Sequence, residues 1–237
     1  TTYAVVVAWL YDDRGRRLLL AEAMRGFSGY LRAKAALYNP DTEGPAAFRA
    51  LIDAHANLVE RLQAARDSLF ARRNHRLQLK RIDALAALLD AFETVLSSDA
   101  DIEYLRRVPH RDLMWRLNRF VHAMAGEVDR LTLALRRRHA HTRAHIHENQ
   151  AARLLAAVDE ALAAAPGDRT IQALLASANK LVLADRYTAD LARALDSDSA
   201  PSTLAANLDL DLFRADVPRR LGVIGRQLHL KAPALRY

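Results

Sequence analysis

Four histidines lie close together in the segment RRRHAHTRAHIHEN and are the residues best placed for chemistry: His139, His141, His145 and His147. His141 and His145 stand four residues apart, so a helix would place both on one face, where they could share a metal ion. A zinc site needs further ligands, and Glu148 is the nearest carboxylate. The competing interpretation is a solvated linker after a helix, because histidine and arginine are favourable near helix C-termini. We favour the linker and predict no metal site.

No enzyme motif accompanies these histidines. The chain has no cysteine, no Gly-x-Ser-x-Gly sequence and no phosphate-binding glycine loop. Two other histidines, His55 and His122, lie on or beside apolar stripes, and we predict that they pack in the core. The sequence therefore predicts a protein that is not an enzyme and needs no cofactor.

The net charge of the chain and the distribution of its basic residues indicate which binding partners to expect. The 237 residues include 35 Lys and Arg against 28 Asp and Glu, a formal net charge of +7. Nucleic-acid binding is disfavoured, because arginines alternate with acids along most of the predicted helices and aromatic residues make up only 6% of the chain. Basic residues instead gather near both ends of the chain: Arg14, Arg16, Arg17, Arg219, Arg220, Arg226, Lys231 and Arg236. A helical module that binds a polyanion through arginines and histidines is the alternative that this pattern leaves open.

The elements that must position these residues are predicted to be helices. Alanine and leucine dominate, and the chain has only 8 glycines. Apolar residues recur every three or four positions between Arg14 and Pro40, which predicts an amphipathic helix ended by Asn39-Pro40. Similar stripes and Pro or Gly signals predict helices over about 45–73, 79–97, 101–107, 110–138, 148–165 and 168–195. We therefore predict an all-α fold, an antiparallel bundle of about seven helices.

The predicted inward faces follow from the same spacing. In the first helix the inward residues are Leu20, Met24, Phe27, Leu31, Ala35 and Tyr38, with Glu22, Arg25, Gly29 and Arg32 outward. In the second they are Phe48, Leu51, Ile52, His55, Leu58, Val59, Leu62 and Leu69. In the fifth they are Leu113, Leu117, Phe120, Val121, Met124, Val128, Leu131 and Leu135.

Two segments depart from the helical pattern. Residues 207–213, NLDLDLF, alternate with a period of two, and we expect a short extended connector along the bundle, after a short helix opened by Pro201. Residues 3–11, YAVVVAWLY, are apolar without a polar face. They predict either a short buried element or the end of a membrane helix.

At this point the residues suggest a family. The segment YLRAKAALY, residues 30–38, resembles the helix that follows the first membrane block in inner-membrane proteins of the fusaric-acid-resistance type, which are regarded as exporters of aromatic compounds. The segment QLHLKAPALRY, residues 227–237, is similar to the approach to that family's second membrane block. A long helical region lies between the two blocks in this family, and the chain fits it in length and class.

The resemblance implies an organisation and a location. Residues 1–11 would be the cytosolic end of a membrane helix, and residues 12–237 a single helical cytosolic domain of a bacterial inner-membrane efflux transporter. Basic residues flanking membrane helices favour the cytoplasmic side and attract anionic lipid headgroups. The implied partners are the membrane blocks of the same polypeptide, such headgroups and further copies of the chain. We also expect the basic flanks to meet at one end of the bundle.

Overall fold

The computed structural model describes residues 2–70, 76–98, 110–137 and 147–196, with side chains described from residue 13 onward in the first helix and from residue 78 in the third. Within these ranges all regular structure is helical, which confirms the all-α prediction. The helices are α1 (Thr2–Tyr38), α2 (Gly44–Phe70), α3 (Arg76–Ser97), α5 (Arg111–Arg137), α6 (Glu148–Ala164) and α7 (Arg169–Leu195). Their bounds lie within a few residues of the predicted ones, except at the start of α1. The predicted helix at 101–107, the helix opened by Pro201 and the connector at 207–213 fall outside the described residues.

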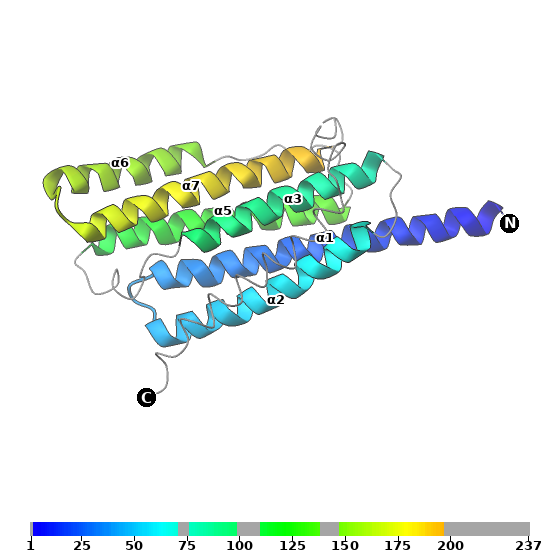
Figure 1. Ribbon diagram of the computed structural model, residues 1–237, viewed down its shortest axis with the longest axis horizontal. Helices are drawn as coiled ribbons and strands as arrows, with labels where there is room; N and C mark the ends of the chain where they lie inside the picture. Colours follow the sequence, from blue (N-terminus) through cyan, green and yellow to red (C-terminus); the bar gives the residue numbers. More distant parts are fainter. Residues whose placement is uncertain (1, 71–75, 99–109, 138–146, 197–237) are drawn as a thin grey trace.

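The first helix is longer than the sequence pattern predicts. It was expected to begin at Arg14, but α1 is one continuous helix from Thr2. Figure 1 shows its N-terminal part extending beyond the ends of the other helices. Among the described helices, none contains a stretch that is both long and apolar enough to cross a membrane.

The core forms around the predicted inward face of α1. Leu20, Met24, Phe27, Leu31, Ala35 and Tyr38 are all fully buried. The chain turns after Tyr38, as Asn39-Pro40 predicts, and α2 returns antiparallel along α1. Gly26 allows this close approach: a Cβ there would meet the Cα of Leu58 at 3.4 Å and the Cδ of Arg61 at 3.0 Å. Gly26 therefore has a packing role in the middle of a helix, where glycine is otherwise unfavourable.

The remaining helices complete an antiparallel bundle (Figure 1). The helix α5 runs antiparallel to α1, because Asn118 donates to the Ala35 carbonyl (2.8 Å) while Ser28 donates to the Ala125 carbonyl (3.2 Å). Similarly, α3 packs along α7, and α6 covers α7 and α5. α6 and α2 lie on opposite outer sides of the bundle.

An aromatic cluster joins the first three helices. The ring of Tyr30 from α1 meets those of His55 from α2 and Phe92 from α3 at centroid distances of 5.9 Å and 5.2 Å. His55 is buried, so its prediction as a core histidine is confirmed. Edge-on aromatic contacts of this kind add specific geometry to ordinary apolar burial.

Two predicted core residues are exposed, and one reason explains both. Ile52 was expected in the inward stripe of α2 but is 38% exposed. His122 was expected in the core and is also exposed. Each directly follows a buried residue, Leu51 and Val121, and the next position in a helix is rotated by about 100°. The stripes of α2 and α5 are therefore narrower than predicted at these points.

Candidate functional site

Polar side chains converge on α1 at the level where it leaves the bundle. Asp13 forms an ion pair with Arg81 of α3 at 2.8 Å, and both side chains are mostly buried. Arg16 donates to the Oε1 atom of Gln78 at 3.1 Å. The amide nitrogen of Gln78 in turn donates to the backbone carbonyl of Leu69, near the end of α2. We call Asp13, Arg16, Gln78 and Arg81 the α1 clasp; it ties α1 to α3 and, through Gln78, to α2.

The three predicted basic residues near the clasp differ in their exposure to solvent. Arg14 is exposed. Arg16 and Arg17 are instead buried, and Arg16 is engaged by Gln78. Sequence spacing did not distinguish the three arginines, because burial depends on which distant helices pack against α1, and for Arg16 these include α3 through Gln78. The other five predicted basic residues, Arg219, Arg220, Arg226, Lys231 and Arg236, lie outside the described residues.

Two further arginines lie at the same end of the bundle. Because α5 runs antiparallel to α1, its last turn lies near the first buried turns of α1. Arg136 and Arg137 occupy that last turn and are exposed. The structure therefore places exposed bases from the beginning of α1 and the end of α5 at one end, which the sequence analysis did not predict.

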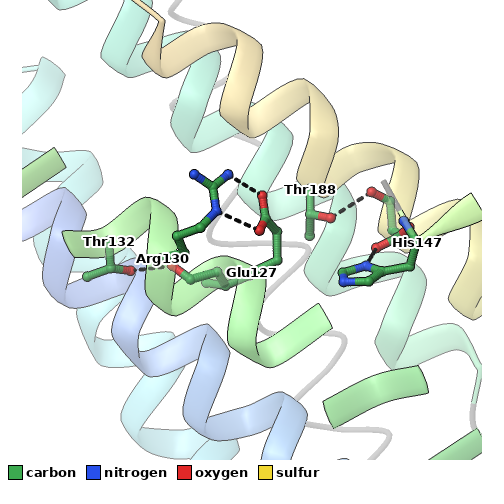
Figure 2. Close-up of polar contacts among 7 residues, drawn as sticks. Glu127, Arg130, Thr132, His147 and Thr188 are labelled. Atoms are coloured by element: carbon green, nitrogen blue, oxygen red, sulfur yellow. Dashed lines mark hydrogen bonds and ion pairs between the residues drawn. The ribbon is translucent and has the colours of Figure 1, made fainter. Parts of the chain in front are cut away.

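Another polar cluster lies between α5, α6 and α7 (Figure 2). The carboxylate of Asp185 in α7 accepts from the backbone N–H of His147 at 3.0 Å and contacts the ring nitrogen Nδ1 at 2.9 Å. Asp185 is only 2% exposed. The ring of His147 also meets the Phe120 ring edge-on, with centroids 6.3 Å apart. His147 directly precedes α6, so these contacts fix the point where that helix begins.

Glu127 and Arg130 of α5 form the second pair in this cluster. Two hydrogen bonds of 2.8 Å and 2.6 Å join them, and Glu127 is buried. The hydrogen bond that the His147 ring donates to Asp185, together with the negative charges of Asp185 and Glu127, raises the pKa of His147, although burial acts in the opposite direction. The hydroxyls of Thr132 and Thr188 are occupied by carbonyls of their own helices, at 2.7 Å and 2.6 Å.

The histidine segment has only one described member. His139, His141 and His145 lie outside the described residues, so the shared-metal and linker interpretations of that trio stay as predictions. His147 differs from the solvated linker expected, because it is partly buried against Asp185. Within the described ranges, no group of three or more His, Asp or Glu side chains is arranged to hold a metal ion.

The sequence around Asp185 does contain a sign that this carboxylate is buried. Asp185 stands beside Ala184 and four residues after Leu181, both buried, and a carboxylate on an inward stripe needs a donor. Gln78 and Arg81 offer no such sign, because their partners on α1 are more than 60 residues away.

Comparison with known proteins gives one match. Residues 1–185 match the model of the family FUSC-like, described as the FUSC-like inner membrane protein yccS. No curated protein and no solved structure matches the chain. The matched range spans α1 to the Asp185 position of α7 and so includes the α1 clasp and the His147–Asp185 pair.

Proposed function

Because the chain belongs to the FUSC-like family of inner membrane proteins, we propose that it forms the cytosolic helical region of an inner-membrane exporter. The cargo in this proposal is an aromatic or related small compound. The helical region has a structural role: it joins membrane blocks of the same polypeptide, supports assembly of subunits or gates access to the transport path.

The observation that carries the proposal is the form of α1. It is a single helix from Thr2 to Tyr38, and its first part extends past the bundle (Figure 1). That part contains the apolar run at residues 3–11. An apolar helix end has little reason to leave a bundle into water, whereas a bilayer provides an apolar environment for it. Residues 3–11 thus serve in this proposal as the cytosolic end of a membrane helix.

The α1 clasp supports the same proposal. It grips α1 at Asp13 and Arg16, directly after the apolar run. A displacement of the extending part of α1 would therefore act on α3 and, through Gln78, on α2. This connection suits a domain that must respond to, or hold in place, a helix coming from the membrane.

Charge at the two ends of the bundle favours one orientation. Exposed Arg14, Arg136 and Arg137 lie at the end from which α1 extends. At the opposite end, exposed Asp41 and Glu43 in the turn after α1 offset the exposed bases Arg111 and Arg169. Each base near an anionic membrane contributes about 1 kcal/mol of attraction. We propose that the basic end faces anionic lipid headgroups.

A topology experiment tests the cytosolic placement. These 237 residues contain no cysteine, so a single cysteine introduced at exposed Ala152 or Asn57 can be followed in spheroplasts, in a full-length protein whose other segments have any cysteines replaced. We expect a membrane-impermeant maleimide to label either position only after the inner membrane is permeabilised. Labelling in intact spheroplasts at both positions would overturn the placement.

A vesicle experiment tests the orientation. The test variant replaces Arg14, Arg136 and Arg137 with Glu. The control variant makes the same charge change at exposed bases away from this end: Arg49, Arg119 and Arg169. We expect vesicles rich in phosphatidylglycerol to bind the wild type and the control, and to lose the test variant. Binding should weaken as salt rises, because exposed charges are screened over about 8 Å at physiological ionic strength.

Two outcomes would count against this orientation. Equal loss of binding in both variants would mean that net charge alone drives the attraction. Binding that survives in the test variant, but is lost when His139, His141, His145 and His147 are replaced, would favour the free-standing polyanion-binding module.

A further inference from the structure

The helix α6 is the shortest of the described helices. Along its 17 residues it has three buried positions, Ala151, Leu154 and Val158. It packs on α7 and α5 as an outer layer (Figure 1). A helix with so few buried contacts has a low local stability, so the anchors at its ends decide how often it opens.

The anchor at its beginning is a buried carboxylate. Asp185 holds both the backbone N–H and the ring of His147. This places a negative charge at the N-terminus of α6, where the unpaired N–H groups of the first turn and the helix dipole favour it. By contrast, the other end of α6 closes with a backbone hydrogen bond from Ala165 to the Ala161 carbonyl.

We propose that α6 is a pH-responsive strap: protonated His147, bound to Asp185, locks the beginning of α6 onto α7, and loss of that proton loosens it. Neutral His147 can still donate one hydrogen bond from Nδ1, so the strap weakens when the proton leaves but keeps a contact. Loosening would uncover the apolar faces of α5 and α7 beneath Leu154 and Val158. This inference concerns the bundle itself and does not depend on the proposed transport role.

The charged groups around His147 determine which protonation state of its ring is favoured. Asp185 faces it from α7, and Glu127 acts on it from α5, where Arg130 offsets part of the Glu127 charge. Glu148, on α6 itself, is exposed. The ring edge of Phe120 supplies an apolar wall. The two carboxylates outweigh the one guanidinium, so the surroundings favour the imidazolium form.

The direction of the pH effect follows from the raised pKa. The ordinary pKa of histidine is 6.5, and that of His147 in the folded protein is higher. The extra stability is therefore fully present below pH 6.5 and is lost as pH rises through the folded pKa. The strap is tight in mildly acidic solution and loosens in alkaline solution.

Thiol labelling of the whole chain tests the proposal. Val158→Cys places a thiol under the strap, and Ala156→Cys places one on its exposed side. The ratio of their labelling rates cancels the pH dependence of the thiol itself and reports the opening of α6. We expect this ratio to rise about fivefold between about pH 6 and pH 8.5, the difference between a charged and a neutral hydrogen bond.

Two histidine variants decide which group is responsible. His147→Asn keeps a donor near the Nδ1 position but cannot titrate, so the ratio should be high and constant across this pH range. His122→Asn removes an exposed histidine of α5 and should keep the wild-type profile. A constant ratio in the wild type, or an unchanged pH dependence in His147→Asn, would overturn the proposal.

A titration followed by NMR gives a second test that needs no introduced cysteine. The imidazole resonances of His147 should titrate with a midpoint above 6.5, and Asp185→Asn should lower that midpoint. A wild-type midpoint at or below 6.5 would contradict the proposal even if the cysteine variants failed to fold.

Discussion

The two ends of the bundle use the same kind of ion pair in different surroundings. Where α1 leaves the bundle, Asp13 and Arg81 are only 18% and 12% exposed. At the opposite end, Asp41 and Arg111 are 57% and 62% exposed. The first pair is enclosed by helices and joins α1 to α3, while the second lies in water beside a turn. The burial of the ion pair, rather than its presence alone, therefore indicates where α1 is held firmly by the other helices.

The largest predicted effect comes from breaking the buried pair. Arg81→Ala removes the guanidinium that forms an ion pair with the mostly buried Asp13 carboxylate. Loss of one member of a fully buried pair costs about 3–5 kcal/mol, and partial exposure should reduce this to about 2 kcal/mol. Urea unfolding of the wild type and the variant measures the difference. A loss below about 0.5 kcal/mol would mean that the two ends are energetically alike.

A smaller effect is expected from the glutamine of the clasp. Gln78→Leu removes the acceptor of Arg16 and the donor to the Leu69 carbonyl, and should destabilise the fold by about 1–2 kcal/mol. Gln172→Leu is the matched control, since the Gln172 amide also donates to a carbonyl, that of Pro166, but in an exposed position at the other end. The control should change the free energy of unfolding by less than about 0.5 kcal/mol. Equal losses would show that bridging three helices adds nothing.

The difference between the ends also explains what could be predicted from the sequence. Helix positions followed from local patterns: Asn39-Pro40 ends α1, and Pro166-Gly167-Asp168 separates α6 from α7. The inward face of α1 followed from spacing alone, because six residues repeat at helical intervals. Features that depend on one helix, such as an amphipathic stripe and its stop signal, are thus readable from the chain.

Features that depend on contacts between two helices far apart in the sequence could not be predicted from the chain. Arg14, Arg16 and Arg17 look equivalent in the sequence, yet Arg16 and Arg17 are buried in the bundle while Arg14 is exposed. Likewise, His147 looked like part of a solvated segment, because its partner Asp185 is 38 residues further along. The apolar run at residues 3–11 gave no helical face, so the true start of α1 was missed. In each case a tertiary neighbour, or the continuity of a helix, overrides the local pattern.

The exposed pair provides the next prediction, and its expected effect is small. Arg111→Ala removes the partner of Asp41, but both side chains are mostly solvated. Such pairs contribute about 0–1 kcal/mol and are screened by salt. We expect a change within about 0.5 kcal/mol in urea unfolding, and none in 1 M salt, where the Debye length is about 3 Å. A loss as large as that of Arg81→Ala would contradict the comparison between the ends.

The smallest expected effect lies at the end away from the clasp, and acid should remove it. Asp168 caps α7 by accepting from the Thr170 N–H at 2.7 Å, and it also contacts His110 at 3.0 Å. The hydrogen bond with His110, followed by that from Thr170, lowers the pKa of Asp168 below its ordinary value of 3.8. Its contribution to stability is therefore present above pH 3.8 and is lost as pH falls through the lowered pKa.

Asp168→Asn isolates that charge, because asparagine is an equally good N-cap and keeps an acceptor for Thr170. The melting temperature of the variant should lie slightly below that of the wild type at about pH 5, and the two should converge by about pH 2, where the wild-type carboxylate is protonated. Calorimetric scans across this range measure the difference. A difference in melting temperature that persists at about pH 2 would mean that the Asp168 side chain acts through its shape rather than its charge. The contrast between the two ends of the bundle would then depend on the α1 clasp alone.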